Sequence, residues 1–125
     1  MSVQHSITYT LATGGVSVTA TQSKTAGQAI TLDESLSIGT DALVALTLDI
    51  SQLKSLYLIS TTACTIETNS GSAADDTITL AANVPLVWQD STYHDNPFSA
   101  DVTALYVTNA AATVLTGYFL VDPTV

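Results

Sequence analysis

The residues best suited to chemistry gather in one stretch near the C-terminal third of the chain. Asp90, His94 and Asp95 place two carboxylates and an imidazole within six residues of one another. Such groups can bind a divalent ion. Asp and Asn side chains also make local hydrogen bonds in ordered, solvated turns. Because neither His94 nor the distant His5 sits in a ligand-spaced motif, we expect a structural loop here and no metal site.

Three aromatic residues in the same stretch form the candidate binding site. Trp88, Tyr93 and Phe98 lie within eleven residues, mixed with amides and carboxylates. Exposed aromatic rings in such company can stack on sugars or anchor a protein partner. Trp88 also ends an apolar run that begins at Val84, which places it in the core if that run is a strand. Core and binding roles therefore both remain open.

No pattern typical of covalent catalysis occurs in the chain. The single cysteine, Cys64, cannot form an internal disulfide, and no base lies near it in sequence. We interpret it as a small core residue of a strand, because free cysteines are usually buried. Gly-x-Ser-x-Gly, P-loop and Gly-x-Gly-x-x-Gly motifs are absent. We therefore expect a protein that is not an enzyme and that uses no cofactor.

The charge and hydropathy of the chain argue against nucleic acid and membranes as partners. The chain has eleven acidic residues and only two basic ones, Lys24 and Lys54. It contains no arginine, and its net charge is −9. Nucleic-acid binding needs cations that displace counterions from phosphates, so it is not expected. Apolar runs of about five residues fall far short of the roughly 20 that span a membrane. The N-terminal residues lack the basic and apolar regions of a secretory signal, which indicates synthesis in a cytoplasm.

Short period-2 segments rich in Thr, Val, Ile and Leu dominate the chain. They predict an all-β protein of about 8–10 short strands, an antiparallel β-sandwich or jelly roll, with no helix longer than two turns. The 125 residues form one domain, in which 1–42 is a possible N-terminal hairpin or arm. Gly14-Gly15 joins two alternating runs and predicts the hairpin. Further strands are expected at Val44–Ile50, Leu56–Ser60, Thr65–Thr68, Thr77–Ala81, Val84–Trp88, Ala104–Thr108 and Val114–Val121.

Some of these segments are apolar on both faces, which indicates a partner. Leu56–Ile59, Leu105–Val107 and Tyr118–Val121 do not alternate as a strand with one wet face should. In a domain this small, we expect at least one of them to lie under a second chain. Leu53–Thr68 also echoes Val102–Gly117 weakly, which predicts two similar hairpins.

The texture and order of these segments resemble small virion proteins of tailed bacteriophages, of the head decoration or cement type. The resemblance covers roughly residues 43–122 and contains no diagnostic motif. It is carried by Val44–Ile50, Leu56–Ile59, Glu67–Gly71, Asp75–Leu80, Pro85–Trp88 and Asp101–Asn109.

The resemblance implies a protein that binds the outer surface of an assembled capsid and stabilises the head. Its partners would be the major capsid protein or other virion proteins, and it would act as a homo-oligomer, with a trimer favoured. Two other classes stay open: a tail, neck or fibre component of the virion, and a carbohydrate-binding module that uses the 88–98 aromatic loop.

Overall fold

A computed structural model describes residues 2–90 and 94–124, and it is an all-β protein as predicted. These residues form strands and turns without a helix. The ten strands are β1 (Val3–Thr13), β2 (Val16–Ala26), β3 (Gln28–Leu36), β4 (Gly39–Val44), β5 (Leu53–Ser60), β6 (Cys64–Thr68), β7 (Thr77–Leu80), β8 (Leu86–Gln89), β9 (Leu105–Asn109) and β10 (Thr113–Val121).

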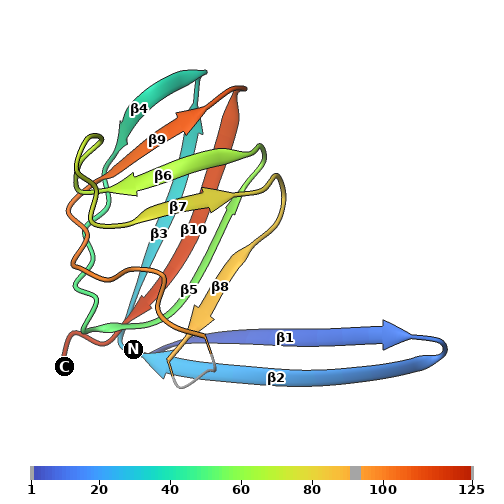
Figure 1. Ribbon diagram of the computed structural model, residues 1–125. Coiled ribbons are helices and arrows are strands. Elements are labelled where there is room, and N and C mark those ends of the chain that lie inside the picture. Colours follow the sequence, from blue (N-terminus) through green and yellow to red (C-terminus); the bar gives the residue numbers. More distant parts are fainter. Residues whose placement is uncertain (1, 91–93, 125) are drawn as a thin grey trace.

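Eight of these strands make a sandwich of two antiparallel sheets, and the other two form a separate hairpin (Figure 1). One sheet has the order β3-β10-β5-β8, and the other has the order β4-β9-β6-β7. Successive strands from β3 to β10 switch from one sheet to the other, apart from the pair β6–β7, which stays within one sheet. This order is that of a jelly roll, the arrangement in which two Greek keys wrap around a single core.

The weakly similar segments Leu53–Thr68 and Val102–Gly117 each pass through one strand and a short connection into a second strand, but neither is a hairpin. β5 and β6 lie in different sheets, as do β9 and β10. Residues 61–63 and 110–112 therefore form arches that cross the sandwich, and the prediction of two hairpins is wrong. The arches lie side by side, because Thr61 and Val114 exchange hydrogen bonds of 3.1 and 2.9 Å. Period-2 sequence cannot distinguish an arch from a tight turn, since both reverse the chain.

The predicted strand at Val44–Ile50 is only partly formed. The side chains alternate as expected, and Val44, Leu46 and Leu48 are buried. The backbone, however, leaves β4 after Val44 and returns to sheet pairing only at Leu48, which bridges to Val102. The segment passes from one sheet toward the other across the edge of the sandwich, so burial alternates without a continuous ladder.

Apolar side chains from both sheets fill the space between them. Leu56, Leu58 and Phe119 are fully buried from one sheet. Ile66 and Val107 meet them from the other sheet and belong to the same cluster. The strands predicted to be apolar on both faces thus use one face for this core, while their other face points outward.

Hydrogen bonds of Asn69 connect the loops at one end of the sandwich. Asn69 has a φ of 69°, a left-handed conformation that asparagine tolerates. Its amide donates to the Asp75 carboxylate at 2.6 Å and to the Asp101 carbonyl at 2.8 Å, and its side-chain oxygen accepts from the Thr103 amide at 2.7 Å. Asp76 likewise accepts two hydrogen bonds from Ser99. These acids therefore organise loops.

Candidate functional site

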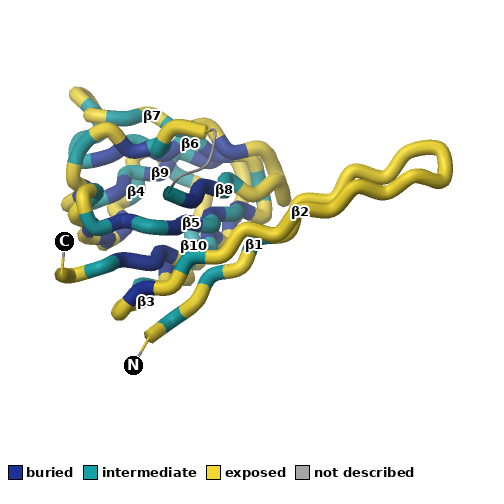
Figure 2. The backbone as a smooth tube through the Cα atoms, turned by 90° about the horizontal axis from the view of Figure 1, so that it is seen from below, coloured by how far each residue is buried: buried dark blue, intermediate teal, exposed yellow. Residues whose placement is uncertain are grey.

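The hairpin β1–β2, hereafter the arm, projects away from the sandwich (Figure 2). Gly14 and Gly15 have φ values of 53° and 83°, the pair of positive angles that a tight primed turn requires. Every residue from Thr8 to Ser23 is exposed. The hairpin predicted around Gly14-Gly15 is thus present and stands outside the body, but it ends at Ala26, and β3 and the start of β4, within the predicted region 1–42, belong to the sandwich. An isolated two-stranded ribbon is marginally stable in water, so its apolar side chains need a partner.

The two faces of the arm differ in chemistry. On one face the hydroxyl groups of Thr8 and Thr21 lie 3.0 Å apart, and those of Ser6 and Ser23 lie 2.8 Å apart. Residues on the other face carry apolar side chains, and in the register Leu11 lies opposite Val18. This apolar arm face consists of Ile7, Tyr9, Leu11, Val16, Val18 and Ala20.

The apolar arm face is uncovered at its distal end. Leu11 is 66% exposed, and Val16 and Val18 are each 61% exposed. Single exposed apolar residues are ordinary, but a contiguous apolar surface marks an interaction site. The arm therefore carries the properties of a binding element.

Acidic residues are confined to the body. All eleven lie between Asp33 and Asp122, whereas the arm, residues 3–26, contains Lys24 and no carboxylate. The net charge of −9 therefore divides into +1 on the arm and −10 on the rest of the chain. The arm can approach an acidic surface without the repulsion that two bodies would experience.

The root of the arm is fixed to the body by a polar cluster. His5 Nδ1 lies 3.1 Å from Ser55 Oγ on β5. The Gln89 side-chain amide of β8 donates to the His5 carbonyl and to Ser55 Oγ, each at 3.3 Å. Ala26 is buried at the same root, and the outward side chain of Leu120 on β10 is fully buried where β1 and β2 approach that strand. These contacts set the direction in which the arm leaves the sandwich.

We predict that the arm root loosens in mild acid. Partial burial lowers the pKa of His5 below its ordinary value of about 6.5, so the docked root favours the neutral imidazole. The stabilisation of the docked root by neutral His5 is fully present above the ordinary pKa. It is lost as the pH falls through the lowered pKa of the folded state. Protonation also places a cation opposite Lys24. Hydrogen-exchange protection factors should fall several-fold in β1 and β2 between neutral and mildly acidic pH while those of β10 stay constant.

His5→Gln is the control for this prediction, because the amide can hydrogen-bond but does not titrate. The variant should remove the pH dependence of arm protection. If the arm of His5→Gln still loosens in acid, another group controls the root.

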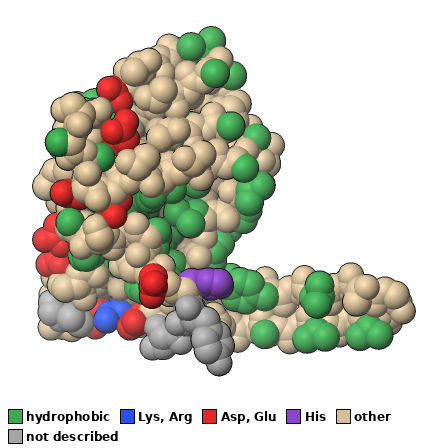
Figure 3. Space-filling view, viewed as in Figure 1, with side chains coloured by type: hydrophobic (Ala, Val, Ile, Leu, Met, Phe, Trp, Pro, Cys, Tyr) green, Lys and Arg blue, Asp and Glu red, His purple; other side chains and the backbone are tan. Residues whose placement is uncertain are grey.

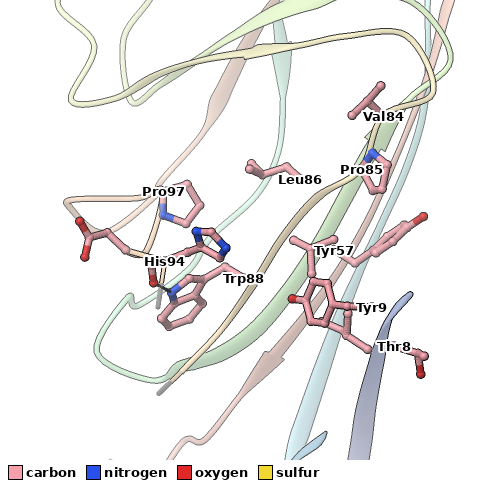
Figure 4. A pocket seen from close by; sticks show the side chains of 12 residues that line it. Thr8, Tyr9, Tyr57, Val84, Pro85, Leu86, Trp88, His94 and Pro97 are labelled. Atoms are coloured by element: carbon pink, nitrogen blue, oxygen red, sulfur yellow. Dashed lines mark hydrogen bonds between the residues drawn. The ribbon is translucent and has the colours of Figure 1, made fainter. Parts of the chain in front are cut away.

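A concave corner lies where the arm meets the outer face of the β3-β10-β5-β8 sheet. Ile7 and Tyr9 of the arm form one wall, and Tyr57 of β5 with Val87 of β8 form the other, around a cavity of about 630 Å³. Figure 4 shows Tyr9 beside Tyr57, with Pro85 and Trp88 along the same cavity. A second cavity of about 300 Å³ continues along the arm root to Tyr118. The corner walls are predominantly apolar.

The sheet wall of this corner is itself an uncovered apolar surface. Tyr118, Tyr57 and Val87 stand side by side across β10, β5 and β8 in the register. The rings of Tyr57 and Tyr118 pack with centroids 6.4 Å apart. Tyr118 is nevertheless 46% exposed, and hydrophobic side chains line this side of the body above the arm (Figure 3). This outer sheet face and the apolar arm face are therefore two walls of one corner.

The three predicted aromatic site residues do not form one exposed surface. Phe98 is 1% exposed and belongs to the core. Trp88 is also largely buried, its indole N–H donates to the His94 carbonyl at 2.9 Å, and it reaches the edge of the corner cavity. Tyr93 lies outside the described residues. A buried Phe98 cannot stack on a sugar, so of the two described aromatic residues Trp88 alone lines the cavity.

The candidate ligand residues beside them are dispersed. Asp90 forms an ion pair with Lys54 at 3.7 Å, and His94 and Asp95 line the corner cavity. Among residues 2–90 and 94–124, no group of three or more His, Cys, Asp and Glu side chains is arranged to hold a metal ion. The same part of the chain contains no helix with the length and hydropathy of a membrane span. Cys64 is buried in β6, in agreement with its interpretation as a strand residue.

The sequence predicted the hairpin, but it did not indicate that the hairpin carries the candidate binding surface. The signal was present, since Tyr9, Leu11, Val16 and Val18 alternate with hydroxyl residues over a stretch without any carboxylate. What the sequence does not reveal is that this hairpin stands apart from both sheets. Comparison of the chain with protein-family models, with curated proteins and with solved structures finds no match.

Proposed function

We propose that the chain is a non-enzymatic structural protein of a virion, of the capsid decoration or cement type. In this role it is made in the host cytoplasm, binds the outer surface of the capsid and stabilises the head. Its partners are the major capsid protein or other virion proteins, and it acts as a homo-oligomer, with a trimer favoured. Nucleic acid and membrane are not among its partners.

The observation that carries this proposal is the exposed apolar face of the arm. A ribbon whose residues from Thr8 to Ser23 are all exposed contributes nothing to the core of its own body. Chains retain such elements to contact other molecules, because an unpartnered apolar ribbon is otherwise an aggregation hazard. An assembly role uses the arm, whereas a free-standing enzyme or small-ligand binder does not need it.

The composition and the fold are compatible with this role, but they are equally compatible with other roles. Jelly rolls occur in viral capsid, lectin and other domains, so the fold alone does not determine the function. The charge of −9 suits a protein kept away from packaged DNA. The strand segments resemble those of phage decoration proteins in composition and order. This resemblance is the reason for proposing the capsid as the surface to which the chain binds.

The mechanism would be additive burial of apolar surface. Each copy covers area across a seam between capsid subunits, and each Å² of apolar surface removed from water contributes about 25 cal/mol before the costs of association. Because symmetry repeats the sites over the shell, modest contributions per copy add up to a large stabilisation of the head.

The proposal predicts that the purified protein sediments with the capsids of the phage that encodes it. Saturable binding to DNA-filled heads, together with a higher temperature of DNA release from decorated heads, is the expected result. Antibody labelling of intact virions then locates the protein on the head. Label on the tail, neck or fibres would replace the decoration role by the alternative virion role. Protein that stays in the supernatant and is missing from virions would refute both.

The carbohydrate-binding alternative has less support. Its aromatic platform depended on Phe98, which is buried, and on Tyr93, which lies outside the described residues. The corner cavity beside Trp88 is lined mainly by apolar side chains, whereas sugar sites combine a ring face with several polar groups.

A further inference from the structure

We propose that the apolar arm face docks into the corner of a second copy of this chain, against the outer sheet face formed by Tyr57, Val87 and Tyr118. The inference rests on the assembly role proposed above and names the partner of the arm. Each copy would give one arm and receive one.

Both surfaces are free in the same molecule, and one cannot cover the other within a single chain. The contacts of His5 with Ser55 and Gln89 hold the root so that the arm points away from the sandwich (Figure 1). Leu11 and Val18, near the arm tip, therefore stay exposed although Tyr118 is also uncovered. A second copy supplies the missing surface for each.

Charge favours this arrangement over contact between two bodies. The body carries −10 and the arm +1, counted over the whole sequence. Two bodies that approach face to face place like charges together, whereas the projecting part of the arm, residues 8–23, carries no charged side chain, since Lys24 lies opposite His5 at the root. The arm is thus the part of the chain that can contact another copy with least repulsion.

The arm presents a row of contacts but does not make a full interface alone. β1, the turn and β2 together span residues 3–26, of which six form the apolar arm face, whereas stable protein interfaces use about 20–30 residues a side, so each copy must both give one arm and receive another. Exchange in which each copy gives and receives the same element forms a dimer or a ring when the rotation between copies closes, and an open filament when it does not. The trimer proposed above is a ring of this kind.

The first test compares two double variants by sedimentation velocity over a range of concentrations. Leu11→Asp with Val18→Asp places two carboxylates on the apolar arm face. The matched control, Thr10→Asp with Thr19→Asp, places the same charges one residue along each strand, on the hydroxyl face. Wild type and control should self-associate, and the apolar-face variant should have a dissociation constant raised at least about tenfold.

The second test addresses the receiving surface. Tyr118→Asp on the outer sheet face should weaken self-association to a similar extent. Leu43→Asp is the control, because Leu43 is an exposed apolar residue, 66% exposed, on β4 of the opposite sheet. Equal effects of the two substitutions would mean that the receiving surface is not the corner.

The third test locates the contact directly. Cys64 is buried, so an introduced surface cysteine is the reactive thiol. Chains with Val18→Cys mixed with chains with Tyr118→Cys should form a heterodimer with a short bismaleimide, and Thr19→Cys chains should do so much less. Equal cross-linking from both arm positions would contradict the proposed face.

A wild-type chain that remains monomeric at high concentration would overturn the inference. If this monomer still binds capsids, and the Leu11→Asp with Val18→Asp variant does not, then the arm contacts the capsid and only the proposed function survives. If the chain self-associates through the corner but never binds a virion, the inference stands without that function.

Discussion

Phe119→Ala is expected to lower the free energy of unfolding by about 3–5 kcal/mol. Phe119 is fully buried in the central strand β10 and belongs to the core cluster between the two sheets. Truncation removes the ring and leaves a cavity that rigid strands on both sides cannot close. Urea unfolding followed by fluorescence or circular dichroism should show a lower midpoint with an unchanged slope.

The neighbouring residue provides the control. Tyr118 is an aromatic residue of the same strand, but it points to the outer face and is 46% exposed. Tyr118→Ala should cost less than about 1 kcal/mol in the isolated chain, because little buried area is lost. Comparable losses from the two substitutions would show that β10 does not have one core face and one outer face.

Gly117→Ala is expected to destabilise the protein by about 1–2 kcal/mol, although alanine usually suits a strand better than glycine. A Cβ at this position would lie 2.8 Å from the Phe119 ring and 3.1 Å from the Leu58 side chain. Both neighbours are fully buried, so neither can move away without disturbing the core. The same unfolding experiment measures the loss.

The two substitutions should be strongly coupled. In a Phe119→Ala background the ring is gone, and the added methyl of Gly117→Ala enters part of the vacated space. The second substitution should then be neutral or stabilising, which reverses its sign. If the two losses simply add, the contact between the Phe119 ring and the site of the missing Cβ does not limit the packing of this core.

The sequence predicted most strands because one property, alternation of apolar and hydroxyl residues, sets which face of a strand is buried. It predicted the turn at Gly14-Gly15 because positive φ angles favour glycine. It failed at residues 61–63 and 110–112, where small residues can turn a hairpin or cross between sheets. That choice depends on which strands pair at long range, and local sequence does not contain it.

The candidate site was predicted less well, for a related reason. Trp88 and Phe98 were predicted as site residues because aromatic residues are frequent at binding surfaces. Aromatic residues are also frequent in cores, and here both side chains are largely buried. Leu11 and Val18 have the pattern of ordinary half-buried strand residues. Only the position of their hairpin outside both sheets makes them a surface, and strand pairing decides that position.

The pairing of the last strand has a consequence for biosynthesis. β10 lies between β3 and β5 in its sheet, so it joins two strands that are translated well before it. Until residues 113–121 leave the ribosome, the sheet is split and Phe119 is missing from the core. The arm, by contrast, precedes every strand of the sandwich in the chain, and its two strands pair only with each other. A nascent chain on the ribosome therefore displays an arm but no complete outer face to receive one. Under the proposed mode of assembly, a chain can receive a neighbour's arm only once β10 has joined its sheet.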